Sequence, residues 1–344
     1  MKRNIRFAAL LAAALMFAVF IGGCAPMQKS CERTWLDTFD TVTQVIIYAD
    51  STERAELYAE RFHGLLSEYH RLYDIYNEYD GLVNLCTLNR TAKYAPVEVD
   101  PRIIELIEFS RELYELTDGT VNVAFGSVLC IWHEYRTKGL ENASAAELPP
   151  TDRLKAAAEH TDINDVIIDG NTVYFADREL LLDVGAVAKG FALQRVVETL
   201  KAEGVTSMLA NVGGNICTIG SKPDGSAWRV AVENPSGAGY SSHLALSGAS
   251  VATSGDYQRY YCVDGKNYHH IIDTQTLMPS KYHSSVSVIC RDAGLADGLS
   301  TALFNVPLSE GLDTVNSMDG VEAIFIAKDG SISTSDGFSL YIGN

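Results

Sequence analysis

Asp297 and Thr301 are four residues apart in a stretch of small and apolar residues, 293–304, whose spacing predicts a helix. Residues four apart share one face of a helix, so the carboxylate and the hydroxyl point the same way. Two hard oxygen atoms one turn apart can bind Mg²⁺, with waters, a carbonyl and substrate phosphates completing the shell. The plainer alternative is a surface pair of Asp and Thr without a ligand. The spacing therefore indicates a candidate metal site.

A second stretch, 181–193, has residue types that suit a phosphate. An apolar run ends at Asp183, small residues follow, and Lys189 comes just before an amphipathic run that predicts a helix. The N-terminus of a helix offers unpaired N–H groups and positive dipole character to an anion. The alternative is a buried strand-to-helix turn in which Asp183 is the N-cap. The stretch is therefore a candidate diphosphate site.

His270 is the candidate general base. It begins the strand-like run 270–273, and Asp273 supplies a carboxylate three residues later. Its neighbour His269 makes the assignment ambiguous, although alternation along a strand would place the two rings on opposite faces. A histidine that is only structural is the alternative for either position.

The elements that would position these side chains do not alternate in a regular β-α-β order. Strands are expected at 35–48, 228–232, 285–289, 323–327 and 338–341, and a hairpin is expected around Gly170-Asn171. Helices are expected over 53–76, from Pro101 with Asp100 as N-cap, and from 191 to near 204. This mixture predicts an α+β fold rather than a doubly wound sheet.

The composition limits the possible partners. The chain has 344 residues, with 27 Lys and Arg against 44 Asp and Glu, and a formal net charge of -17. No basic patch is evident, so we expect no nucleic acid partner. An acidic protein that binds a diphosphate is expected to use backbone N–H groups and a metal ion.

The N-terminus predicts export. A basic start is followed by the apolar run 7–21, which is too short for a comfortable membrane span, and by Ile-Gly-Gly-Cys at 21–24. This resembles a bacterial lipobox, so we expect a signal peptide at 1–23, lipid on Cys24, a polar tether over 24–34 and one domain over 35–344. The protein would then be anchored to the cell membrane and face outside the cytoplasm. The alternatives are an ordinary secretory signal with an incidental Cys24, or an uncleaved anchor.

The candidate metal site, diphosphate site and base all lie within a set of five ordered motifs. They read DVGAVAKGFA at 183–192, NVGGNI at 211–216, ATSGDY at 252–257, HIID at 270–273 and LADGLSTAL at 295–303. In order and approximate spacing they resemble the ApbE family, the FAD:protein FMN transferases. The resemblance runs from about residue 35 to the C-terminus.

The resemblance implies mixed sheets with packed helices, a T-fold-like architecture, and an active site in a cleft between two lobes. It implies Mg²⁺-dependent transfer of the FMN moiety of FAD to a threonine or serine hydroxyl of a target protein, with release of AMP. The acceptor would be a flavoprotein subunit of a membrane or exported redox complex. Two alternatives remain open: an FAD pyrophosphatase that yields FMN and AMP, and a flavin-binding lipoprotein without catalysis.

The resemblance also assigns residues, position by position. The implied metal ligands are the carbonyl of Ala186, Asp297 and Thr301, and the implied base is His270. The implied FAD contacts are Phe39, Tyr76, Thr120, Val121, Asn122, Asp183, Lys189 and Ile272. Phe39 and Asn122 depart from the usual Met and Asp. We expect Phe39 to keep an apolar wall, whereas Asn122 loses a charge and makes its contact doubtful.

Overall fold

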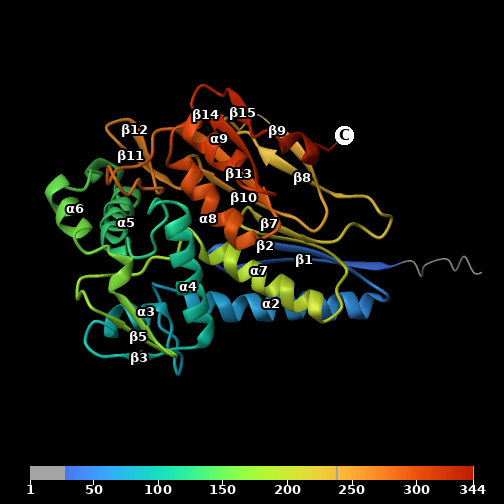
Figure 1. Ribbon diagram of the computed structural model, residues 1–344, viewed down its shortest axis with the longest axis horizontal. Helices are drawn as coiled ribbons and strands as arrows, with labels where there is room; N and C mark the ends of the chain where they lie inside the picture. Colours follow the sequence, from blue (N-terminus) through green and yellow to red (C-terminus); the bar gives the residue numbers. More distant parts are fainter. Residues whose placement is uncertain (1–27, 238, 344) are drawn as a thin grey trace, which may run out of the picture.

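The structure is a computed structural model that describes residues 28–237 and 239–343, and an eight-stranded antiparallel sheet forms its centre (Figure 1). The order of the strands is β1-β2-β6-β7-β10-β13-β14-β15. Their bounds are Lys29–Thr38, Thr41–Ala49, Ser207–Val212, Asn215–Ile219, Ser250–Gly255, His283–Cys290, Glu322–Ala327 and Ile332–Thr334. The sheet brings segments from both ends of the chain side by side, which places the predicted motifs on one framework.

The two faces of the sheet have different covers, because alternate residues of a strand point to opposite sides. One face packs against the helices α2 (Thr52–Tyr73), α7 (Ala188–Ala202), α8 (Ala293–Phe304) and α9 (Leu308–Asn316). The other face packs against the hairpin of β8 (Trp228–Glu233) and β9 (Tyr240–Leu246). Within β6, Met208 belongs to the helix side and Leu209 to the hairpin side.

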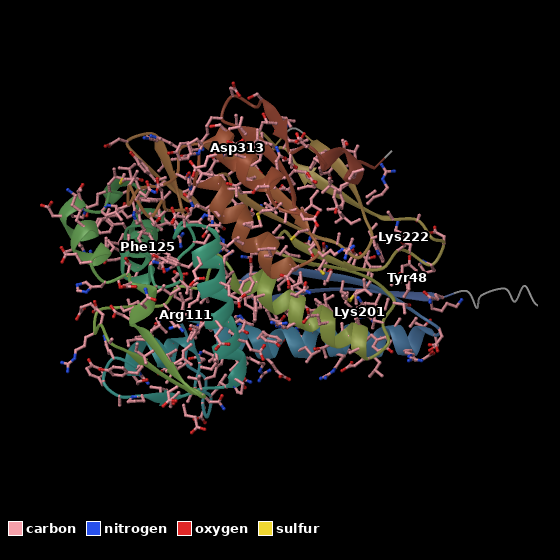
Figure 2. The ribbon with its side chains drawn as sticks, in the orientation of Figure 1. Tyr48, Arg111, Phe125, Lys201, Lys222 and Asp313 are labelled. Atoms are coloured by element: carbon pink, nitrogen blue, oxygen red, sulfur yellow. The ribbon has the colours of Figure 1, made fainter. Side chains whose placement is uncertain are left out.

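The remaining elements form a second part beside the sheet (Figure 1). Its helices are α3 (Leu85–Thr91), α4 (Pro101–Leu116), α5 (Gly126–Glu141) and α6 (Thr151–Ala158). Its sheets are β3-β5-β4 (Val97–Glu98, Thr172–Phe175, Val166–Asp169) and the hairpin β11-β12 (Tyr260–Val263, Lys266–His269). Arg111 of α4, labelled in Figure 2, donates to the carbonyl of Val166 and so ties α4 to β4.

Several local predictions are confirmed. The fold class is α+β, and α8 spans the predicted 293–304. Asp100 accepts from the N–H of Arg102 at 2.9 Å with Pro101 in the first turn, so the start of α4 was correctly predicted. The hairpin at Gly170-Asn171 is present as β4 and β5.

Other local predictions were wrong. The expected strand 35–48 is a hairpin that turns at Phe39 and Asp40, both of which have positive φ. β1 begins at Lys29, so part of the predicted tether 24–34 belongs to the central sheet. The expected strand 338–341 is a 3₁₀ turn, Phe338–Tyr341. Other short 3₁₀ turns are Ala143–Ala145 and Ile163–Asp165.

Two predictions at the N-terminus lie outside the described residues, namely the signal peptide 1–23 and the lipidated Cys24. Among the helices that the structure describes, none has the length and apolar character needed to cross a membrane.

Candidate active site

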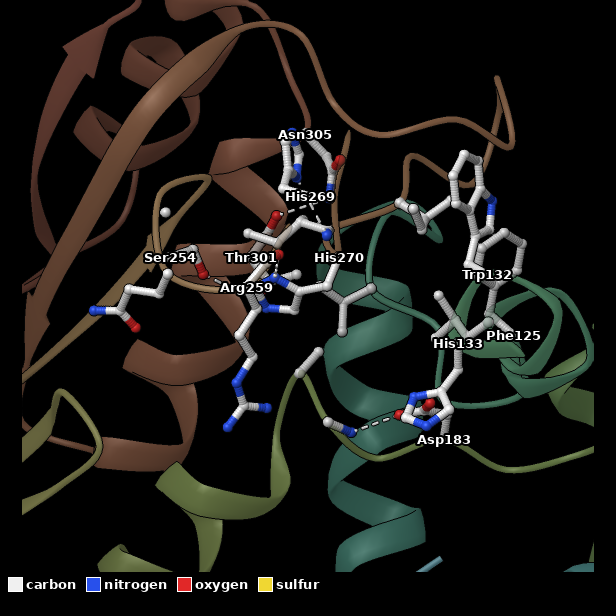
Figure 3. A pocket seen from close by; sticks show the side chains of 18 of the residues that line it. Phe125, Trp132, His133, Asp183, Ser254, Arg259, His269, His270, Thr301 and Asn305 are labelled. Carbon is white, nitrogen blue, oxygen red and sulfur yellow. Dashed lines mark hydrogen bonds between the residues drawn. The ribbon is translucent and has the colours of Figure 1, made fainter. Parts of the chain in front are cut away.

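A cavity of about 250 Å³ lies where the second part meets the ends of β10 and α8 (Figure 3). Most of the residues that were predicted to bind FAD or metal line it, together with the predicted base His270: Tyr76, Thr120, Val121, Asn122, Asp183, Ala186, Lys189, Ile272, Asp297 and Thr301. The five motifs therefore converge on one site, as expected.

Phe39 is the predicted contact that does not line this cavity. Its backbone N–H donates to Nδ1 of His70 at 3.1 Å, and its ring meets the His70 ring edge-on at 5.4 Å between centroids. The structure therefore assigns Phe39 to packing at the β1–β2 turn, because the tight turn directs its ring toward α2.

Asp297 is held by the close packing of α7 against α8. The backbone N–H of Gly190 donates to Oδ2 of Asp297 at 2.9 Å, and Nζ of Lys189 lies 3.8 Å from the same oxygen. Burial raises the pKa of Asp297, although Lys189 and the Gly190 N–H oppose the shift. A buried carboxylate at a cavity wall favours a bound cation, which would compensate for its lost hydration.

Thr301 follows one turn later on the same face of α8. Its hydroxyl lies 3.2 Å from that of Ser254 at the end of β10, and Ala186 lies in the same cavity. Among the described residues, no group of three or more His, Cys, Asp or Glu side chains could hold a metal. One carboxylate, one hydroxyl and one carbonyl do fit Mg²⁺, which keeps waters and substrate phosphates as ligands.

The Asp183 segment is fixed by its neighbours rather than by a long strand. Leu181 forms a single bridge with Phe125, and the N–H of Asp183 donates to the carbonyl of Val123 at 2.8 Å. A Cβ on Gly126 would collide with the carbonyl oxygen of Leu181, so this close approach requires glycine. The segment therefore enters the cavity beside the N-terminus of α5.

One alternative made Asp183 the N-cap of α7, and the structure shows that it is not. Val187 occupies that position, and no side chain caps the helix there. Oδ1 of Asp183 instead accepts from the N–H of Gly185 at 2.9 Å. Burial raises the pKa of Asp183, although this hydrogen bond and Arg136 oppose the shift. The carboxyl lines the cavity and can receive a donor from a ligand.

Asn122 uses both ends of its amide inside the protein. Oδ1 accepts from the N–H of Ala124 at 2.9 Å, and Nδ2 donates to the carbonyl of Thr161 at 2.8 Å. The presence of Asn122 in place of the Asp usual in the family therefore has a structural explanation, because a carboxylate could not donate to the Thr161 carbonyl.

The structure resolves the ambiguity between the two histidines. His269 is buried at the end of β12, and its Nε2 bonds the carbonyl of Ser280 at 2.8 Å, so it is structural. Nδ1 of His270 lies 3.2 Å from the carbonyl of Arg259, which can only accept. Nδ1 therefore carries the proton, and Nε2 keeps a lone pair with which to take another.

The electrostatic surroundings of His270 keep it neutral. Although His270 is exposed to the open cavity, desolvation by the surrounding residues, and then the guanidiniums of Arg259 and Arg136, lower the pKa of its ring. Asp273, expected as a possible partner, instead accepts from the N–H of Gln275 at 2.8 Å. The Arg259 carbonyl, and not a carboxylate, orients the ring.

Sequence reasoning gave no role to several polar residues of the cavity, among them Arg136, Asn215, Arg259 and Asn305. Oδ1 of Asn305 is buried without a hydrogen-bond partner among the described residues, so it can serve a ligand, whereas the side chain of Asn215 acts on Asp297 and lowers the pKa of that carboxyl. Asn305 continues the i, i+4 series of Asp297 and Thr301, a signal that could have found it.

Comparisons with known proteins identify the family of this chain. The model of the ApbE family matches residues 39–325. The FAD:protein FMN transferase of Treponema pallidum is 33% identical over 271 residues, 74% of this chain and 73% of that protein. That of Vibrio cholerae is 30% identical over 261 residues, 75% of each chain.

Solved structures of ApbE proteins have the same fold as this chain. The ApbE protein of Thermotoga maritima has a TM-score of 0.82 at 26% identity, covering 92% of this chain and 100% of that one. The flavinyl transferase ApbE of Pseudomonas stutzeri has a TM-score of 0.75 at 26% identity, covering 92% and 98%. The chain described here belongs to the ApbE family.

Proposed function

We propose that this chain transfers the FMN moiety of FAD to a threonine or serine hydroxyl of a target protein, with Mg²⁺ as cofactor and AMP as the second product. The observation that carries the proposal is the meeting of Asp297, Thr301, Lys189 and His270 in one cavity. The names of the relatives support FMN transfer from FAD to a protein.

In this reaction the acceptor hydroxyl oxygen forms a bond to the phosphorus of the FMN phosphate. The bond between that phosphorus and the bridging oxygen breaks, and AMP leaves with this oxygen. Nε2 of His270 takes the proton of the hydroxyl, because Nδ1 is occupied by its bond to the Arg259 carbonyl. His270 later releases the proton to solvent.

The remaining requirement is to neutralise and position the diphosphate. The Ala186 carbonyl, Asp297 and Thr301 would hold Mg²⁺, which when bound supplies positive charge to the phosphate oxygens. Lys189, 3.8 Å from Oδ2 of Asp297, adds a cation on the same side of the cavity. The N–H of Gly190 orients the Asp297 carboxylate for this task.

The proposal is tested by incubating the protein with FAD, Mg²⁺ and a candidate acceptor protein, followed by mass spectrometry. Covalent FMN on the acceptor supports transfer, free FMN indicates a pyrophosphatase, and unchanged FAD indicates a binding protein. Asp297→Asn should abolish turnover. The matched control is Asp313→Asn on the exposed side of α9 (Figure 2), which should leave turnover unchanged. Full activity of Asp297→Asn would exclude the proposed metal site.

We also propose export, with a lipid on Cys24 and an acceptor in a membrane or exported redox complex. The support is the Ile-Gly-Gly-Cys sequence at 21–24 behind a basic and apolar start. Labelling cells with a fatty-acid analogue should mark the wild type and leave Cys24→Ala unlabelled. Equal labelling of both would contradict lipidation at this position.

A further inference from the structure

Two arginines in the cavity have no salt-bridge partner among the described residues, although Asp183 raises the pKa of Arg136. Arg136 lies on α5, and Arg259 lies in the loop between β10 and β11. Neither forms an ion pair within the described part of the chain, although acidic residues greatly outnumber basic ones in the sequence. Since arginine readily pairs with carboxylates in an acidic protein, two such side chains in one cavity need an explanation.

Arg136 is held in place by a neutral histidine. Its Nη2 donates to Nδ1 of His133 at 2.8 Å, and the His133 ring packs near that of Tyr76, with 5.2 Å between centroids. Burial and the Arg136 charge lower the pKa of His133, which keeps Nδ1 available as an acceptor. This bond uses one of the five N–H groups of the half-buried guanidinium. The others remain available to a ligand.

Arg259 is held by its own backbone. Its carbonyl accepts from both the backbone N–H and Nδ1 of His270, at 3.2 Å each. The side chain extends from this anchor into the cavity, away from the His270 ring (Figure 3). The Arg259 guanidinium forms no hydrogen bond with the proposed base, His270, although its charge acts on the pKa of that ring.

The two guanidiniums act on the same part of the cavity. Both lower the pKa of His270, and the pKa of Arg136 is itself lowered by burial and by Arg259, although Tyr76 and Asp183 oppose this shift. Two like charges in one cavity repel each other, and a bound anion would remove this cost. Lys189 belongs to the other group of charges, next to Asp297. The two guanidiniums and the Lys189–Asp297 pair are therefore separate groups of charges in the cavity.

We propose that Arg136 and Arg259 form a second anion site that binds phosphate oxygens of the flavin nucleotide on the side of the cavity carrying His270 and Tyr76. The planar guanidinium matches the geometry of phosphate and can donate two parallel hydrogen bonds. The inference rests on the proposed function, in that it takes a flavin nucleotide to be the ligand. It adds specificity for a phosphorylated flavin to the metal site formed around Asp297.

The experiment compares the binding of riboflavin, FMN and FAD, measured at constant ionic strength without an acceptor protein. Arg136→Met and Arg259→Met should each weaken the binding of FMN and FAD by about tenfold or more, since a charged hydrogen bond is lost. Riboflavin, which has no phosphate, should bind within about twofold of the wild type. Arg136→Lys and Arg259→Lys should restore part of the loss.

Arg178→Met is the matched control, because this arginine is exposed and lies outside the cavity, and it should change nothing. Thermal unfolding checks that each variant folds. An equal loss of riboflavin and FMN binding would overturn the proposal, as would unchanged FMN binding in both methionine variants. Because binding is measured without turnover, the comparison of riboflavin, FMN and FAD remains valid even if the protein does not transfer FMN.

Discussion

Replacing Gly190 by alanine tests how the metal site is built. A Cβ at this position would lie 2.5 Å from Cβ of Asp297 and closer still to the carbonyl oxygen of Ala293. Neither group is the end of a flexible side chain, so α7 and α8 have to separate. Separation lengthens the 2.9 Å bond from the Gly190 N–H to Asp297. The substitution therefore couples a packing defect to the position of the proposed metal ligand.

The expected size of the effect follows from three contributions. Overpacking lowers the free energy of unfolding by about 1–3 kcal/mol. Complete loss of the hydrogen bond to the buried carboxylate would lower it by about a further 1.5–3 kcal/mol. The higher helix propensity of alanine returns about 0.5–1 kcal/mol. Because separation of the helices relieves part of the clash as it weakens the bond, we expect a net loss of about 2–3 kcal/mol in the free energy of unfolding.

Urea unfolding followed by circular dichroism measures this loss, and AMP release from FAD measures turnover. We expect turnover to fall by about tenfold to a hundredfold, because the carboxylate is displaced from its productive position. Gly64→Ala is the control, since Gly64 lies exposed in α2 and a Cβ at that position would have nothing within 4 Å. It should gain about 0.5–1 kcal/mol. A Gly190→Ala protein that is as stable as Gly64→Ala, or fully active, would refute the reasoning.

Three further predictions concern protonation, the turn at Asn122 and the metal. The base has to be neutral and its pKa is lowered, so kcat/KM should stay level from pH 8 down through pH 6.5, the usual pKa of histidine, and fall only at lower pH. Arg259→Met should move this fall to higher pH, and a half-maximal rate near pH 6.5 in both proteins would contradict the assignment. Asn122→Asp, although it restores the residue usual in the family, should destabilise the protein by about 1–3 kcal/mol in urea unfolding, because the carboxylate would face the Thr161 carbonyl. Chelation with EDTA should stop AMP release and added Mg²⁺ should restore it, whereas unchanged release after chelation would exclude a metal-dependent reaction.

The parts of the fold that could be predicted are those whose signals are local. The start of α4 depends on Asp100 and Pro101 alone, and α8 has the period of a helix over its whole length. The turn at Gly170-Asn171 likewise needs only two residues. Where the signal was a short apolar run, as at 338–341, length and hydrophobicity did not distinguish a strand from a 3₁₀ turn.

Most of the predicted site residues do line the cavity, and the motifs supplied the larger share of them, whereas their roles depend on contacts between distant segments. Phe39 leaves the cavity because the chain turns there with positive φ. His269 and His270 are adjacent in the sequence, and only the carbonyls of Ser280 and Arg259 separate a structural ring from a reactive one. No local pattern contains this information.

The proposed roles of Arg136 and Arg259 likewise depend on contacts between distant segments, so the sequence did not reveal them. A charged residue outside any recognised motif is expected to face solvent, and that expectation holds unless a second segment covers it. Arg136 is enclosed because α5 packs against β11, the strand that follows Arg259 directly. A hairpin that did not cover α5 would have left the half-buried guanidinium of Arg136 in water, as that of the exposed Arg259 partly is. Their specificity therefore arises from the packing of β11 on α5, which is also where substitutions distant from the five motifs should alter flavin nucleotide binding.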